Sequence, residues 1–114
     1  MDINSILACV DHTLLAVTAT PEEIKQTCMD GVRFCTASVC IPPSYVRFAK
    51  ECTEGRIPVC TVVGFPNGYN TTAAKYAETA DALNNGADEI DMVIHIGRLK
   101  MKDYAYVEDE IKQL

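Results

Sequence analysis

Short apolar runs alternate with helix-like segments along this chain, and the runs begin roughly 20 to 30 residues apart, the length of a strand and helix unit. The clearest run is β-branched, spans residues 57–63 and ends at the turn-rich segment 64–68. Other strands are expected at residues 9–13, 36–41 and 89–96. This alternation predicts an α/β fold with a parallel sheet of about four strands.

Helix signals fill the intervals between these strands. Thr20 can cap a helix, Pro21 suits its first turn and Glu23 can complete a capping box. Four more helices are expected, at residues 4–8, 44–52, 71–85 and 104–114. In the helix at 71–85, Tyr76 and Leu83 stand near helical spacing with several alanines. The length of 114 residues suits one compact domain, and we expect residues 1–114 to form it.

The chain is acidic, with a formal net charge of -6 and a pI near 4.7. Nucleic acids and anionic membranes require clustered Lys and Arg, so neither is an expected partner. The N-terminal segment lacks a basic leader, and no apolar run approaches the ~20 residues of a membrane span. The six cysteines lie in apolar-periodic segments without a CxxC pair, which favours reduced thiols. These features predict a cytoplasmic protein.

A carboxylate interrupts the last apolar run. Removing an ionised carboxylate from water is costly unless it is paired, so Asp91 is an unexpected residue for a strand that serves only the core. Side chains alternate across a strand, which puts Asp91 on one face with Glu89 and His95, opposite a face of isoleucines and methionine. The polar face suits the lining of a site.

Two earlier strands have similar polar faces. Asp11 and Thr13 share one face of the first strand, and Ser38 and Cys40 share one face of the second. If these faces turn to the same side, the four residues converge with Asp91. Two carboxylates in a partly dry pocket raise at least one pKa, which prepares a group for proton transfer. The alternative is that both carboxylates are structural and bond backbone amides or a histidine.

Other candidate sites have weaker support. His12 and His95 have no metal-ligand spacing, so no metal is expected. Cys40 is either a reactive thiol or a small buried hydrophobe. The chain has no GxGxxG, GxxxxGK[ST] or GxSxG motif, so no cofactor is expected.

Four motifs resemble deoxyribose-phosphate aldolase when taken together and in order. They are DHTLL (residues 11–15), ASVCIPP (37–43), VCTVVGFPNG (59–68) and GADEIDMVI (86–94). The resemblance implies a (β/α)₈ barrel that cleaves 2-deoxy-D-ribose 5-phosphate reversibly into acetaldehyde and D-glyceraldehyde 3-phosphate. It implies a lysine Schiff base, no metal or other cofactor, a role in deoxyribonucleotide catabolism, and a homo-oligomer or an association with another half-barrel.

The resemblance also implies roles for individual residues. Asp91 would belong to a proton relay beside the Schiff-base lysine. Asp11 and Thr13 would match the acidic and hydroxyl positions of the first strand, and Cys40 would be a thiol lining the pocket. The chain departs from the common pattern at Ala16, where many members carry lysine, and at His95, where asparagine is common.

Length is the largest departure, because a full barrel has eight strands and about 250 residues. The chain is therefore expected to be the N-terminal half of a barrel. Its six lysines all fall on expected helices or loops, so we expect no Schiff-base lysine within it and no activity from this half alone. Two alternatives remain: a non-catalytic half-barrel that self-associates, and another phosphosugar lyase or isomerase on the same barrel.

Overall fold

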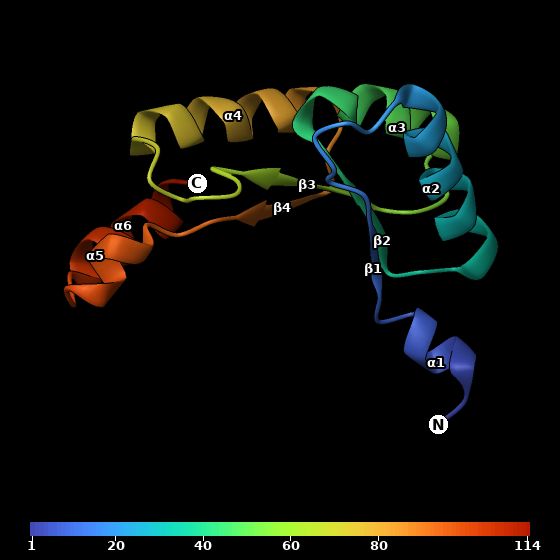
Figure 1. Ribbon diagram of the computed structural model, residues 1–114, viewed down its shortest axis with the longest axis horizontal. Helices are drawn as coiled ribbons and strands as arrows, with labels where there is room; N and C mark the ends of the chain where they lie inside the picture. The colour runs from blue at the N-terminus through green and yellow to red at the C-terminus, as the bar shows by residue number, and fades with distance from the viewer.

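A single parallel sheet organises the chain, which the computed structural model describes over all residues 1–114 (Figure 1). Its strands are β1 (Asp11–Thr13), β2 (Ser38–Ile41), β3 (Val59–Val63) and β4 (Glu89–Met92). They lie in the order β1-β2-β3-β4, so each strand pairs with the next one along the chain. The prediction of an α/β fold with four parallel strands is confirmed.

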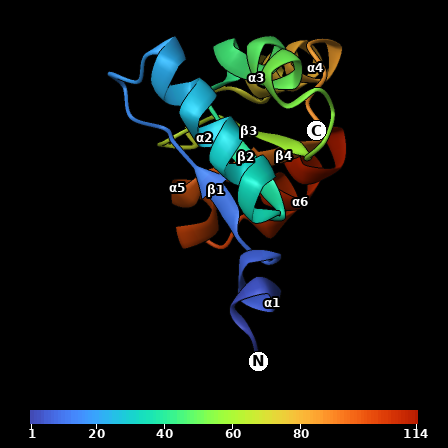
Figure 2. The same ribbon diagram turned by 90° about the vertical axis from the view of Figure 1, so that its right-hand side faces the viewer.

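Helices cover only one face of this sheet. The helices are α1 (Ile3–Leu7), α2 (Pro21–Phe34), α3 (Val46–Thr53) after a 3₁₀ turn η1 (Pro43–Tyr45), α4 (Thr72–Asn84), α5 (Ile96–Lys100) and α6 (Tyr104–Gln113). Figure 1 shows α2, α3 and α4 side by side above the sheet, and Figure 2 shows the same layer from the end. Both views show α1 projecting away from the sheet, and Figure 1 shows α5 and α6 beyond the end of β4, which leaves the opposite face open. None of the helices combines the length and the hydropathy that a membrane crossing requires.

The predicted capping box starts α2. The Glu23 N–H donates to Thr20 Oγ1 at 3.3 Å, and the Thr20 N–H donates to Glu23 Oε2 at 2.8 Å. Each bond satisfies a backbone donor that has no partner within the helix. The position and direction of α2 on the sheet therefore follow from a local sequence signal.

The hydrophobic core lies between the sheet and helices α2 and α3. Its eight buried residues are Ile24, Cys28, Val39, Ile41, Val46, Ala49, Ile57 and Val59. Helix α2 approaches β2 very closely at Gly31, where an added Cβ would lie within 3.0 Å of Val39 Cγ1. Only glycine fits this contact, so Gly31 sets the spacing between the helix layer and the sheet.

The expected last strand is too long. β4 ends at Met92 rather than at residue 96, because its neighbour β3 turns away at Gly64, where φ is +66°. Beyond Met92 there is no strand left to pair with. His95 instead caps α5, which the sequence did not predict, by accepting the Arg98 N–H at Nδ1 over 3.2 Å. The expected place of His95 on a strand face is therefore wrong.

The buried side of α4 also differs from its apolar spacing. Tyr76 and Leu83 are 58% and 52% exposed, whereas Lys75 is fully buried together with Thr79 and Ala82. A lysine takes the inward position because it has a buried carboxylate partner on α6. Helical spacing thus located the helix but not the face that packs.

Candidate functional site at the open face of the sheet

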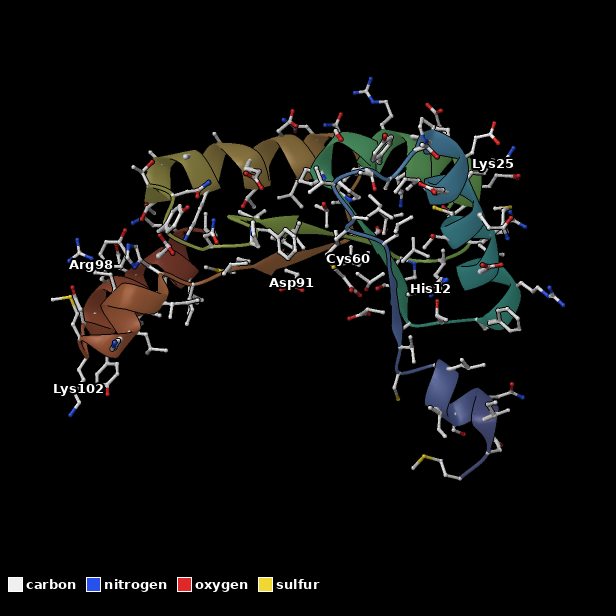
Figure 3. The ribbon with its side chains drawn as sticks, in the orientation of Figure 1. His12, Lys25, Cys60, Asp91, Arg98 and Lys102 are labelled. Atoms are coloured by element: carbon white, nitrogen blue, oxygen red, sulfur yellow. The ribbon has the colours of Figure 1, made fainter.

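The register of the sheet brings the predicted polar residues onto one face. Asp11 pairs with Ser38 at the start of β1 and β2, and Val62 pairs with Asp91 near the ends of β3 and β4. Between them runs the cysteine row, which consists of Thr13, Cys40, Cys60 and Glu89. Register partners in neighbouring parallel strands point the same way, so all these side chains share the face opposite the helices. Figure 3 shows Asp91 leaving β4 on that open side.

Asp11 is fixed by a hydroxyl from the next strand. Ser38 is fully buried, and its Oγ–H donates to Asp11 Oδ1 over 2.6 Å. Thr13 donates its own hydroxyl to the Asp11 carbonyl at 2.7 Å. A short hydrogen bond to a carboxylate is stronger than one between neutral groups, so it holds the Asp11 side chain in one orientation at the open face.

The two thiols of the cysteine row influence each other. A hydrogen bond from Cys60 holds the pKa of Cys40 below its usual range, although burial and the negative charges of Asp91, Asp11 and Glu89 act in the opposite direction. The same hydrogen bond, with burial, raises the pKa of Cys60. Cys40 is thus the more acidic thiol of the pair, yet it is only 3% exposed.

Asp91 is the exposed carboxylate nearest the carboxyl end of β4. It is the third of the four residues of that strand, and its charge acts on Cys40 across the sheet. Asp11 and Asp91 do not stand in the same row, because the cysteine row lies between them. Both carboxylates are exposed in residues 1–114, so further protein would have to cover them to make the pocket dry.

An apolar hollow of about 420 Å³ lies at the carboxyl ends of the strands. It lies among the loops that follow β1, β2 and β3, and its lining includes Leu15, Ala16, Tyr45 and Phe65. In parallel α/β proteins, ligands bind at the carboxyl ends of the strands, and these loops are at that edge. The hollow and Asp91 therefore belong to the same end of the sheet.

The two histidines are far from forming a pair. His12 points to the helix side, where Nε2 lies 4.0 Å from Asp30 Oδ2 on α2. His95 packs edge-on against the Tyr106 ring beyond the end of β4, with the ring centroids 5.8 Å apart. Neither imidazole joins Asp11 and Asp91 at the open face.

Comparison with known proteins agrees with this geometry. No protein-family model matches the chain. A deoxyribose-phosphate aldolase of Streptococcus pyogenes serotype M5 (strain Manfredo) is 54% identical over 114 residues, which is all of this chain and 51% of the relative. Over its whole length the chain is similar to one half of deoxyribose-phosphate aldolases. It spans about half the length of the curated relatives that it matches.

Solved structures of deoxyribose-phosphate aldolases have the same fold over the matched part. A protein assigned to this family from Coccidioides immitis superposes with a TM-score of 0.94 at 34% identity, covering 99% of this chain and 45% of that one. A deoxyribose phosphate aldolase from Aeropyrum pernix, described as tetrameric, has a TM-score of 0.78 at 26% identity and covers 82% and 41%. The four strand and helix units are thus half of the barrel of these aldolases, as predicted.

No sequence pattern predicted the ion pair that lies behind the open face of the sheet. Lys75 Nζ lies 2.5 Å from Glu110 Oε1, with exposures of 0% and 2% for the two side chains. The partners are 35 residues apart and no local pattern links them. Cys60 was also missed, although its position two residues before Val62 in β3 would have put it on the same face as Asp91.

Proposed function

We propose that this chain is half of an enzyme that cleaves 2-deoxy-D-ribose 5-phosphate reversibly into acetaldehyde and D-glyceraldehyde 3-phosphate. The reaction proceeds through a lysine Schiff base within a (β/α)₈ barrel, of which residues 1–114 supply one domain-sized half. The observation that carries this proposal is the 54% identity, over every residue of the chain, to a relative named for the activity. The Schiff-base lysine and the phosphate-binding loops belong to the other half.

Asp91 is the relay residue in this proposal. Its position near the carboxyl end of β4 is where residues of a (β/α)₈ barrel meet the substrate. A carboxyl group there can donate a proton to the departing hydroxyl as the imine forms, and the resulting carboxylate can take up the substrate hydroxyl proton as the carbon–carbon bond breaks. Asp11, Thr13 and Cys40 line the same pocket, with Asp11 held by its bond from Ser38.

The distribution of lysines supports a nucleophile from the other half. Lys25, Lys50, Lys75, Lys100 and Lys112 lie on helices, and Lys102 follows α5. Lys75 is the one fully buried lysine, and its ammonium is held by Glu110, so it is inaccessible to an aldehyde. In Figure 3, Lys25 projects from α2 and Lys102 from the α5–α6 end, while Lys50 is paired with Asp88 over 2.9 Å.

The same proposal extends to the substrate, the cofactor requirement, the partners and the cellular location of the enzyme. The substrate is a small phosphosugar, and neither a metal nor another cofactor is needed for imine chemistry. The acidic surface is unsuited to nucleic acid or to anionic membranes. We expect a cytoplasmic homo-oligomer with a role in deoxyribonucleotide catabolism.

The proposal is tested in a fused protein that contains a full barrel. Residues 1–114 are fused to the part of the Streptococcus pyogenes relative that they do not match, and aldehyde release from deoxyribose 5-phosphate is measured. The fused protein is expected to turn over, and borohydride with acetaldehyde should trap one imine on a lysine of the added half. Residues 1–114 alone serve as the control and should give neither result. An adduct on the control would overturn the absence of the nucleophile, and turnover of a different phosphosugar only would favour another lyase or isomerase.

A second candidate is a non-catalytic half-barrel that pairs with a second copy. It is favoured by the open polar face and by the two edge strands, β1 and β4, which lack a partner on one side. The mass of residues 1–114 in solution, measured by light scattering over a wide concentration range, tests it. A strict monomer would contradict self-association. A dimer of residues 1–114 would support it.

A further inference from the structure

A buried charge pair lies directly behind the aldolase face. Lys75 on α4 donates from Nζ to Glu110 Oε1 on α6 at 2.5 Å, and Thr72 donates from Oγ1 to Glu110 Oε2 at 2.7 Å. Both charged side chains are almost completely removed from water, and every buried polar side-chain atom has a hydrogen-bond partner. The pair joins the two helices that flank the end of β4.

The Lys75 ammonium has one more acceptor, and this one belongs to the backbone of the site. It donates to the Val93 carbonyl at 2.9 Å, while the Val93 N–H donates to the Val63 carbonyl at 2.9 Å. Val93 is therefore held on both sides just where the chain leaves β4. Because Val93 follows Asp91 by two residues, the ammonium fixes the backbone from which the Asp91 side chain projects.

The loop after β3 is built around the same lysine. A Cβ on Gly64 would lie 2.8 Å from Lys75 Cε, and a Cβ on Gly68 would lie within 3.0 Å of the Ile94 carbonyl oxygen. Both glycines have positive φ, +66° and +75°, so the loop folds tightly over the lysine stem and against the chain after β4. Lys75 thus contacts two of the strand-to-helix loops that build the site in barrels of this kind.

Stability alone does not explain why this position carries charge. Replacing a buried ion pair with apolar residues of similar volume is often neutral or stabilising, because the desolvation of two charges offsets their attraction. What an apolar pair cannot supply is a directed hydrogen bond to the Val93 carbonyl. The charge is therefore explained better by the placement of the backbone than by the free energy of folding.

We propose that the Lys75–Glu110 pair is a positioning device for the aldolase reaction, which sets Asp91 by fixing the backbone after β4 and the loop after β3. Lys75 acts through Asp91 and does not touch substrate. This inference rests on the proposed function. It predicts that the pair governs turnover more than substrate binding, since small displacements of a catalytic group slow the chemical step.

The test uses the fused protein that carries residues 1–114 and the other half of the barrel. The variant Lys75→Met/Glu110→Leu is expected to stay folded with a small loss of melting temperature, because the Val93 carbonyl loses its donor. It should hold KM within about twofold and lose roughly 10-fold to 100-fold in kcat. The matched control is Lys112→Met/Glu108→Leu, which makes the same replacements at the exposed ion pair of α6, 2.6 Å apart, and should leave kcat unchanged. An unchanged kcat in the Lys75 variant would overturn the positioning role.

A second arm separates positioning from general loosening of the structure. In an Asp91→Asn background, Lys75→Met/Glu110→Leu should reduce kcat little further, because both changes act on the same step. Losses that multiply would mean that the pair acts elsewhere and would contradict the inference. If the double variant fails to fold, Glu110→Gln replaces it, with a lowered kcat supporting the role and an unchanged kcat refuting it. No turnover by the unmodified fusion would overturn the proposed function, and this inference with it.

Discussion

Gly31→Ala should lower the free energy of unfolding, although replacing a glycine within a helix by alanine normally raises it by about 1 kcal/mol. The added Cβ would lie within 3.0 Å of Val39 Cγ1, 3.2 Å from Thr36 Oγ1 and 3.3 Å from Ile57 Cδ1. Val39 is fully buried between the sheet and α2, so it cannot move aside. Overpacking of this kind lowers the free energy of unfolding by about 3 kcal/mol at the upper end of its usual range. The better helix propensity of alanine offsets about 1 kcal/mol, so the net loss is about 2 kcal/mol.

Urea unfolding monitored by circular dichroism measures this loss of unfolding free energy. For a chain of this size, the loss corresponds to a melting temperature lower by roughly 8 °C. In a Val39→Ala background, the Cγ1 contact is gone and Gly31→Ala should be neutral or stabilising. Gly97→Ala in α5 is the control, because its Cβ would meet only the His95 ring at 3.3 Å. A gain in stability from Gly31→Ala with Val39 intact would refute the close packing of α2 on β2.

Two further predictions concern titratable groups. Although burial raises it, the pKa of Asp88 lies below its ordinary value of 3.8 because a backbone N–H and Lys50 hydrogen-bond to the carboxylate. Asp88→Asn should therefore lower the free energy of unfolding at neutral pH by less than about 1 kcal/mol, since the side chain is 42% exposed. The difference should vanish as the pH falls from about 4 through the lowered pKa, and a difference that persists in acid would contradict the assignment. Burial raises the pKa of Cys28 to about 11, so alkylation at mildly alkaline pH, read by mass spectrometry, should modify exposed Cys9 and Cys35 well before Cys28.

Much of the architecture could be predicted from the sequence because it depends on local signals. The β-branched run that contains β3 and the capping box that starts α2 are both short-range patterns. The end of β4 could not be predicted in this way. The alternation of Ile94 and Ile96 imitates a strand, whereas the actual end is decided by where β3 turns away at Gly64.

In the candidate site, too, local patterns could be predicted from the sequence and tertiary contacts could not. Alternation along single strands predicted that Asp11, Cys40 and Asp91 each lie on a polar strand face, because that property needs only the two-residue period of a strand. Whether the three faces turn to the same side was left open by the sequence and is decided by the pairing of the strands. The register between strands, which inserts the cysteine row between the two carboxylates, is a tertiary property. The pairing of Lys75 with Glu110 is another, since it joins residues that only packing of α4 on α6 brings together.

The central claim is that Asp91 transfers protons in an aldolase whose other half supplies the lysine. The most direct measurement compares kcat for deoxyribose 5-phosphate cleavage between the fused protein and its Asp91→Asn variant. We predict a loss of roughly 100-fold to 10,000-fold, the usual contribution of a general acid–base group, with the melting temperature unchanged because the side chain is exposed. Equal turnover by the two proteins would contradict the relay role of Asp91.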